Sequence, residues 1–74
     1  MSAYQQRVVN EKQELDEKLN KLRSFIKTDV CMALPFEDRS LLAQQERVMT
    51  EYSRILAERI ARFSLEPVAP SAGL

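Results

Sequence analysis

Apolar and polar positions follow helical spacing in two long stretches of the chain, residues 4–26 and 41–63. In the first stretch the apolar residues recur after three, four or seven positions, which places them along one side of a helix. They are Tyr4, Val8, Leu15, Leu19, Leu22 and Ile26. A short connector with one proline separates the stretches. The pattern predicts an all-α fold: a two-helix antiparallel hairpin with helices at about residues 3–27 and 36–64 and a short helical turn at about residues 29–34.

The apolar stripe of the second stretch is wider than one neighbouring helix requires. Its members are Leu41, Leu42, Val48, Met49, Tyr52, Ile55, Leu56, Ile60 and Phe63. One edge of such a stripe can face the first helix while the other faces a second protomer, so the stripe predicts a homo-oligomer that completes its core as a helical bundle. The residues expected at this oligomer or partner interface are Leu41, Val48, Met49, Tyr52, Ile55 and Leu56, with Met32 and Phe36 from the connector.

Capping residues mark the ends of the predicted elements. Ser2 is suited to accept a backbone N–H group at the start of the first helix, and Thr28 is suited to start the short turn. Pro35 favours the first turn of the second helix. The last residues, 65–74, contain two prolines and the only glycine, and we expect them to form a flexible C-terminal tail.

The size and composition of the chain favour self-association. It has 74 residues, one cysteine and no histidine. A chain this short seldom builds a core worth more than about 3–5 kcal/mol without disulfides, metal or oligomerisation. Cys31 alone forms no internal disulfide, and without histidine the usual zinc sites are absent. We expect Cys31 to pack as a small apolar residue at the end of the hairpin, in a reducing compartment.

The charges balance, with eleven lysines and arginines against eleven aspartates and glutamates. No net field therefore attracts duplex nucleic acid or an anionic membrane. No apolar run approaches the ~20 residues that a membrane span requires, and the first residues lack the regions of a signal peptide. We expect a cytoplasmic protein that makes no use of a membrane.

Little in the sequence supports catalysis. The chain has no histidine, no glycine-rich phosphate loop and no hydrolase elbow, and its carboxylates fall on exposed helical faces. Glu37 and Asp38 are adjacent, but they lie where a helix N-terminus favours negative charge. The sequence therefore predicts no enzymatic activity, no cofactor and no metal site.

Polar residues interrupt both apolar stripes at Lys12, Gln45 and Arg59. One interpretation makes them extended surface side chains or contacts that fix the register of a bundle. The other makes them part of a pocket between helices, in which a cation binds phosphate and the ring of Tyr4 stacks on a base. Arg7, one turn from Tyr4, would place a second cation beside that ring. The spacing leaves both interpretations open.

The layout resembles a family of small bacteriophage counter-defence proteins, the helical-hairpin cyclic-nucleotide sponges that act against CBASS and Thoeris immunity. The resemblance covers roughly residues 8–60. The residues that carry it are Asn10, Glu11, Glu14, Leu15, Leu22, Arg23, Asp38, Arg39, Ala43, Gln44, Gln45, Met49 and Arg54. It implies an oligomer of two-helix protomers that holds a cyclic di- or trinucleotide at subunit junctions without cleaving it. By this resemblance Tyr4, Lys12, Thr28 and Arg39 are candidate ligand-binding residues.

Two other functions remain open. The wide stripe, or the corner formed by Val30, Met32, Leu34 and Phe36, could bind and inhibit a host or viral protein, because contiguous apolar patches usually mark interfaces. A coiled-coil scaffold is the third possibility, and the polar residues within the stripes count against it.

Overall fold

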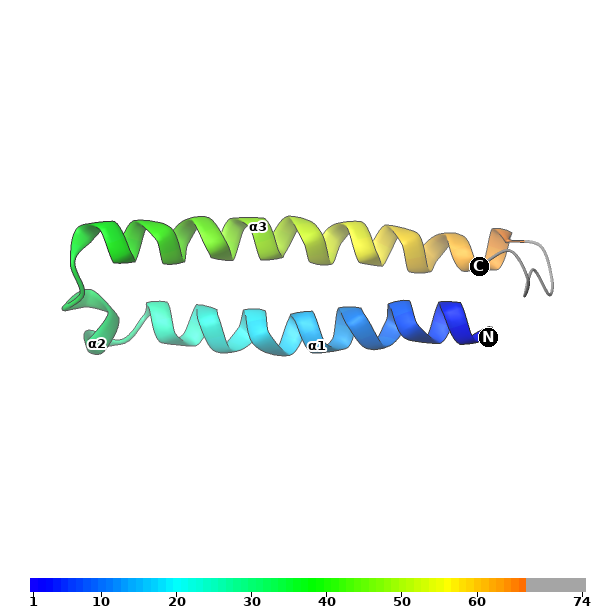
Figure 1. Ribbon diagram of the computed structural model, residues 1–74, viewed down its shortest axis with the longest axis horizontal. Coiled ribbons are helices and arrows are strands. Elements are labelled where there is room, and N and C mark those ends of the chain that lie inside the picture. The colour runs from blue at the N-terminus through cyan, green and yellow to red at the C-terminus, as the bar shows by residue number, and fades with distance from the viewer. Residues whose placement is uncertain (67–74) are drawn as a thin grey trace.

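The computed structural model describes residues 1–66 as a hairpin of two long antiparallel helices (Figure 1). Helix α1 (Ala3–Ile26) leads into a single-turn helix, α2 (Asp29–Met32), and α3 (Phe36–Ala61) then returns alongside α1. A 3₁₀ turn, η1 (Arg62–Leu65), follows α3. The described residues contain no strand, so the predicted all-α hairpin is confirmed.

The hairpin is a rod. Its extents are 52 × 17 × 15 Å and its radius of gyration is 16.6 Å, whereas a compact domain of this length has a radius of gyration of about 11 Å. Two helices side by side bury only one stripe each. The buried apolar side chains of the described residues are accordingly few, namely Val8, Leu19, Cys31 and Leu56.

A capping box starts α1. The Ser2 hydroxyl accepts the Gln5 backbone N–H at 3.2 Å, and the Gln5 side-chain oxygen accepts the Ser2 N–H at 3.0 Å. These reciprocal bonds satisfy two donors that a helix N-terminus otherwise leaves free, and they confirm the predicted capping role of Ser2.

The end of the described chain is tied to this start. Gln5 Nε2 donates to the Glu66 carboxylate at 2.9 Å. Leu65 and Glu66, expected to begin the flexible tail, thus belong to η1 and to a contact with α1. The other residues of the predicted tail, 67–74, lie outside the described residues.

The connector is organised around Thr28 and Cys31. The Thr28 hydroxyl donates to the Phe25 carbonyl at 2.6 Å and accepts the Cys31 N–H at 3.2 Å, which caps α2. Cys31 is 2 % exposed, so its predicted packing at the hairpin end is confirmed. Helix α3 then begins at Phe36, with Pro35 as the N-cap residue one position before the helix.

The helices meet along two seams with alternating spacings of three and four residues. The seam of α1 comprises Gln5, Val8, Lys12, Leu15, Leu19, Leu22 and Ile26, and that of α3 comprises Leu42, Glu46, Met49, Ser53, Leu56, Ile60 and Phe63. All of these residues are buried or half-buried, and every other residue between positions 41 and 63 is exposed. This heptad pattern is that of an antiparallel coiled coil.

The structure divides the residues predicted for the oligomer interface. Leu56 is wholly buried and Met49 half-buried, both in the seam against α1. Leu56 is therefore not free to meet a partner, and the prediction is corrected for this residue, whereas for the half-buried Met49 it stays a prediction. The remaining α3 residues of the set stay exposed and form what we call the apolar edge: Leu41, Val48, Tyr52 and Ile55, whose exposed fractions run from 40 to 68 %.

Two polar residues expected in the α3 stripe also lie outside the seam. Gln45 and Arg59 are exposed, each one position before a seam residue, Glu46 and Ile60 respectively. Since one position turns a helix by about 100°, this difference moves a side chain from the seam to its flank. Lys12, by contrast, lies in the seam of α1 as the pattern predicted.

Candidate functional site

Tyr4 lies at the open end of the hairpin and is held by residues near the end of α3. Its ring centroid is 6.0 Å from that of Phe63, with the two planes inclined by 60°. Arg59 Nη2 donates to the Tyr4 hydroxyl at 3.0 Å, and the guanidinium lies 6.0 Å from the ring centroid. The bond to Tyr4 raises the pKa of Arg59. The cation at this ring is thus Arg59, whereas the predicted Arg7 is an exposed residue of α1.

Thr28 and Arg39 lie at the opposite end. Thr28 caps α2, and Arg39 Nε donates to the Leu34 carbonyl at 3.1 Å while its guanidinium lies 5.9 Å from the Phe36 ring. Helix α1, which separates Thr28 from Tyr4, has 24 residues and is therefore about 36 Å long. A single protomer cannot bring Tyr4 and Thr28 to one small ligand.

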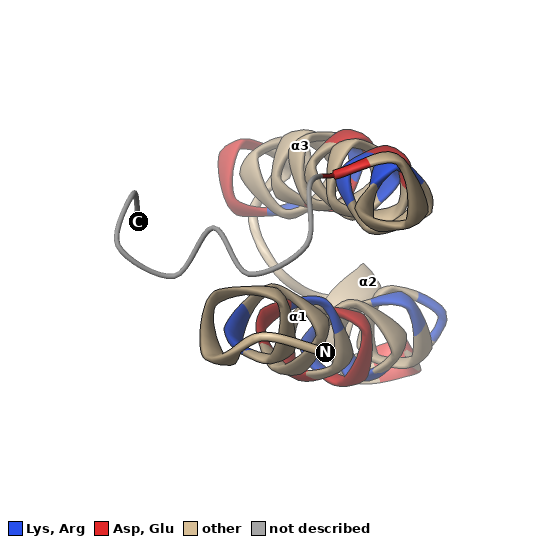
Figure 2. Cartoon of the chain, turned by 90° about the vertical axis from the view of Figure 1, so that its right-hand side faces the viewer, with Lys and Arg blue, Asp and Glu red and all other residues tan. Residues whose placement is uncertain are grey.

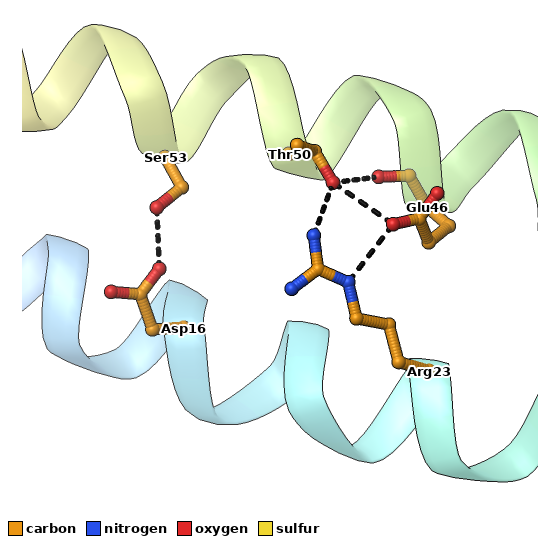
Figure 3. Close-up of polar contacts among 5 residues, drawn as sticks. All are labelled: Asp16, Arg23, Glu46, Thr50 and Ser53. Carbon is orange, nitrogen blue, oxygen red and sulfur yellow. Dashed lines mark hydrogen bonds and ion pairs between the residues drawn. The ribbon is translucent and has the colours of Figure 1, made fainter.

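Lys12 belongs to a polar cluster in the middle of the hairpin. Its Nζ lies 2.6 Å from Asp16 Oδ2 and 3.2 Å from the Ser53 hydroxyl. The Ser53 hydroxyl in turn donates to Asp16 Oδ1 at 2.5 Å (Figure 3). The hydrogen bond from Lys12, followed by that from Ser53, lowers the pKa of Asp16 below its ordinary value. Asp16 is therefore a fixed carboxylate at neutral pH, and it joins α1 to α3.

Arg23 forms a second cluster across the helices. Its Nε donates to the Glu46 carboxylate at 2.9 Å and its Nη2 donates to the Thr50 hydroxyl at 2.8 Å (Figure 3). The Thr50 hydroxyl lies 2.8 Å from the Glu46 backbone carbonyl and 3.0 Å from the Glu46 carboxylate, and its proton is shared between these two acceptors. The bond from Arg23, and after it the bond from Thr50, lowers the pKa of Glu46. These contacts fix the guanidinium over the groove between α1 and α3.

A cavity of about 310 Å³ lies between these two clusters. Its lining residues are Asp16, Leu19, Asn20, Arg23, Thr50 and Ser53. We call this side of the hairpin the polar edge. Thr50 follows the seam residue Met49 by one position, whereas Val48 of the apolar edge precedes it, so the two edges flank the seam on opposite sides.

The charges around the cavity balance. Lys12 and Arg23 are cations, and each is paired with one carboxylate, Asp16 or Glu46. Seen along the rod from its open end, acidic and basic residues likewise lie on both long helices (Figure 2). Such a site offers directed hydrogen-bond donors and acceptors with little net field, which suits a polar but neutral group better than an isolated phosphate.

Only Lys12 among the predicted ligand-binding residues lies close to this cavity, paired with one of its lining residues. The sequence interpretation did not single out the cavity residues Asp16, Thr50 and Ser53, and it named Arg23 only within the resemblance. The sequence does contain a pattern that indicates some of these residues. Ser53 occupies a seam position at heptad spacing, and Asp16 and Arg23 each follow a seam leucine by one position. What the spacing does not show is which side chains meet when they lie 37 positions apart in the sequence, as Asp16 and Ser53 do.

Two further findings bound the chemistry of the described residues. No group of three or more histidine, cysteine, aspartate or glutamate side chains is arranged to hold a metal ion within residues 1–66. None of the helices in that range is long and apolar enough to span a membrane.

Comparison with known proteins places the chain in a family. Neither the curated proteins nor the solved structures contain a match to it. A family model described as Sequestin matches residues 2–62, which include both long helices, the connector and every residue that lines the cavity. The chain therefore belongs to the Sequestin family.

Proposed function

We propose that this protein is a cytoplasmic phage or prophage accessory protein that counters host immunity by sequestering a cyclic oligonucleotide signal. Membership of the Sequestin family supports the sequestering role, since the family name itself denotes it. The resemblance in sequence to cyclic-nucleotide sponges supports the class of ligand. The structural observation that carries the proposal is the cavity on the polar edge, where the fixed guanidinium of Arg23 lies beside the hydroxyls of Thr50 and Ser53.

The state of the ionisable groups supports binding without cleavage. A general acid or base works best when its pKa lies near the operating pH. Asp16 and Glu46 depart from that condition, because their cationic partners lower the pKa of each carboxyl from a value already well below neutrality. The cavity is thus suited to hold a ligand rather than to transfer protons to it.

Self-association is part of the proposal. The apolar edge exposes Leu41, Val48, Tyr52 and Ile55 at spacings of seven, four and three residues, the same spacing by which the protomer pairs its own helices. A second copy that covers this edge would complete the bundle. It would also allow Tyr4 of one protomer to approach Thr28 or Arg39 of another, which the length of α1 forbids within one chain.

A thermal-shift screen against cyclic di- and trinucleotides tests the proposed function. A ligand at about 100 times its dissociation constant stabilises the folded state by about 2.7 kcal/mol, which raises the melting temperature of a small domain by several degrees. The bound ligand, released by heating and analysed by chromatography, should be intact. The proposal fails if no cyclic oligonucleotide in the panel shifts the melting temperature, or if the released ligand is cleaved.

A second candidate function is supported by the connector. Val30, Met32 and Phe36 are between 62 and 69 % exposed at the closed end of the hairpin, and such an apolar corner is typical of a protein-binding surface. A host or viral protein bound there would be released by Met32→Ser and Phe36→Ser but not by Arg23→Ala. Pull-down with these variants distinguishes this function from sequestration of a nucleotide.

A further inference from the structure

We propose that Asp16 and Arg23 select which of two seams of α3 packs against α1, and that this choice leaves the other seam free for a second copy of the chain. The choice of seam concerns the protomer itself and goes beyond the proposed function. The use of the free seam rests on the self-association proposed above. Two observations support the selection, namely the repeat pattern of α3 and the hydrogen bonds that cross from α1.

Helix α3 carries two series of residues at heptad spacing, one position apart. The seam against α1 comprises Leu42, Glu46, Met49, Ser53, Leu56, Ile60 and Phe63. We call the other series the outer seam, and it comprises Leu41, Gln45, Val48, Tyr52, Ile55 and Arg59. The outer seam contains the whole apolar edge, and each series has two polar positions. Because both are mostly apolar at the same spacing, apolar packing by itself distinguishes them only weakly.

The two series differ in the bonds that their central polar residues make to α1. The Ser53 hydroxyl donates to Asp16 at 2.5 Å, and Arg23 donates to Glu46 at 2.9 Å, so both polar residues of the present seam are bonded across the helices (Figure 3). In the outer seam the Gln45 amide bonds Met49 of its own helix, and Arg59 reaches α1 only at the open end, where it bonds Tyr4.

Arg23 favours the present seam over the outer one. Packing the outer seam against α1 would turn α3 by about 100° and bring each residue one position earlier into place. Arg23 would then face Gln45 and Met49 in place of Glu46 and Thr50. A neutral amide and a thioether bind a guanidinium less well than a carboxylate and a hydroxyl do.

Asp16 acts in the same direction. In the turned helix it would face Tyr52 in place of Ser53. A tyrosine side chain is far larger than that of serine, and overpacking a close contact between helices is destabilising. Turned by one position the other way, α3 would bring Arg47 and Arg54 to the places of Glu46 and Ser53, which composition alone disfavours.

The choice of seam decides which residues stay at the surface. In the present packing Val48 and Ile55 are 68 and 43 % exposed, whereas Leu56 is wholly buried. If the outer seam faced α1, Leu56 would be exposed together with the polar Glu46 and Ser53. A second copy thus meets the apolar edge because Asp16 and Arg23 bind the other seam.

NMR of the full chain tests the selection through contacts between methyl groups. A ¹³C-labelled chain is diluted with an excess of unlabelled chain, so that contacts between two labelled methyl groups report one protomer. In the parent chain the methyl groups of α1 should contact Leu56 and not Val48. In the double variant Asp16→Ala, Arg23→Ala we expect contacts from Val48 to α1 to appear. The ratio of the two packings should change about tenfold, because each partly solvated crossing contributes a few-fold.

Three further variants sharpen this test. Glu17→Ala with Lys21→Ala removes the same kinds of charge from exposed positions of α1 and should leave the packing unchanged. Each single variant, Asp16→Ala or Arg23→Ala, retains one crossing and should also show the parent contacts. Gln45→Glu with Glu46→Gln keeps the composition of α3, moves the carboxylate to the outer seam and should shift the packing in the direction of the double alanine variant.

The outcomes bear separately on the two parts of the proposal. If neither the double alanine variant nor the exchanged variant shows contacts from Val48 to α1, or if the control shows them equally, the selection is overturned. Sedimentation velocity should show weaker self-association of the double alanine variant. Changed packing with unchanged self-association overturns the role of the free seam. All of these results leave nucleotide sequestration standing, which the thermal-shift screen tests by itself.

Discussion

The two edges of the hairpin flank the same seam and differ in what they expose. The apolar edge presents Val48 and Ile55 to solvent, whereas the polar edge holds Arg23 and Asp16 in bonds to α3. On α3 the difference is one of register, since Ile55 precedes the buried Leu56 and Thr50 follows Met49. One helix pair thus separates a surface suited to another protein chain from a surface suited to a small polar ligand.

The largest effect is expected from a charge on the apolar edge. Ile55→Glu would bury a carboxylate wherever a second copy covers this edge, which we expect to weaken self-association roughly a hundredfold. The control is Ala57→Glu, which places the same charge one position after Leu56 instead of one before it. Sedimentation velocity over a range of concentrations measures both. If the two variants self-associate with equal affinity, the interface does not lie on the apolar edge.

A smaller effect is expected from the polar edge. Arg23→Ala removes the guanidinium that lies over the cavity and should weaken binding of a cyclic dinucleotide about tenfold, the effect of losing one charge-assisted hydrogen bond. Lys21→Ala removes a cation of the same helix that lines no part of the cavity and serves as the control. Association of the protomers should be the same in both variants. A loss of association in Arg23→Ala would mean that the polar edge also lies in an interface.

The seam offers a test of why the polar edge keeps its hydroxyl groups. Ser53→Leu fills a half-buried seam position with an apolar side chain, and we expect it to raise the free energy of unfolding by about 1 kcal/mol, because the leucine adds buried apolar area to the seam while the partly solvated Asp16 stays paired with Lys12. The same leucine should occupy the cavity and abolish ligand binding. Urea unfolding measures the first effect, with Ser24→Leu at an exposed position as the control. A clear loss of stability would show that Ser53 serves the fold rather than a ligand.

The smallest effect is expected from acid. The pKa of Asp16 and that of Glu46 are lower in the folded protein than their ordinary values of 3.8 and 4.5. Each carboxylate therefore adds stability above its unfolded pKa, and that contribution is lost as the pH falls from about 5 through the folded values. Both groups are partly solvated, so the loss is modest. The double variant Asp16→Asn, Glu46→Gln should show a smaller fall in melting temperature between pH 5 and pH 2 than the parent chain. An identical fall would show that these pairs contribute nothing.

The hairpin was predictable because its determinants are local. Helical spacing, Ser2 at the start of α1 and the proline in the connector each act within a few residues of the chain. The prediction that the apolar stripe of α3 is wider than its contact with α1 is also confirmed, since Val48 and Ile55 remain exposed beside the seam. These features depend on periodicity, which a sequence displays directly.

The polar residues of the seam were harder to assign, for a physical reason. Gln45 and Glu46 are neighbours in the sequence, and either one could occupy the position between the apolar residues Leu42 and Met49 of the α3 stripe. Packing against α1 decides between them, because a single position turns the side chain by about 100°. Ser53 and Glu46, the α3 partners of Asp16 and Arg23, lie 37 and 23 positions away, so these bonds depend on the register between the helices, which no local pattern specifies.

The most direct test of this division of the hairpin is an NMR titration of the ¹⁵N-labelled chain with the cyclic di- or trinucleotide that raises its melting temperature most. We predict that chemical-shift changes cluster at Asn20, Arg23, Thr50 and Ser53, and that the resonances of Val48, Tyr52 and Ile55 on the other side of the seam stay in place. Changes concentrated on the apolar edge or around Tyr4, or no changes at all, would contradict the assignment of the ligand to the polar edge.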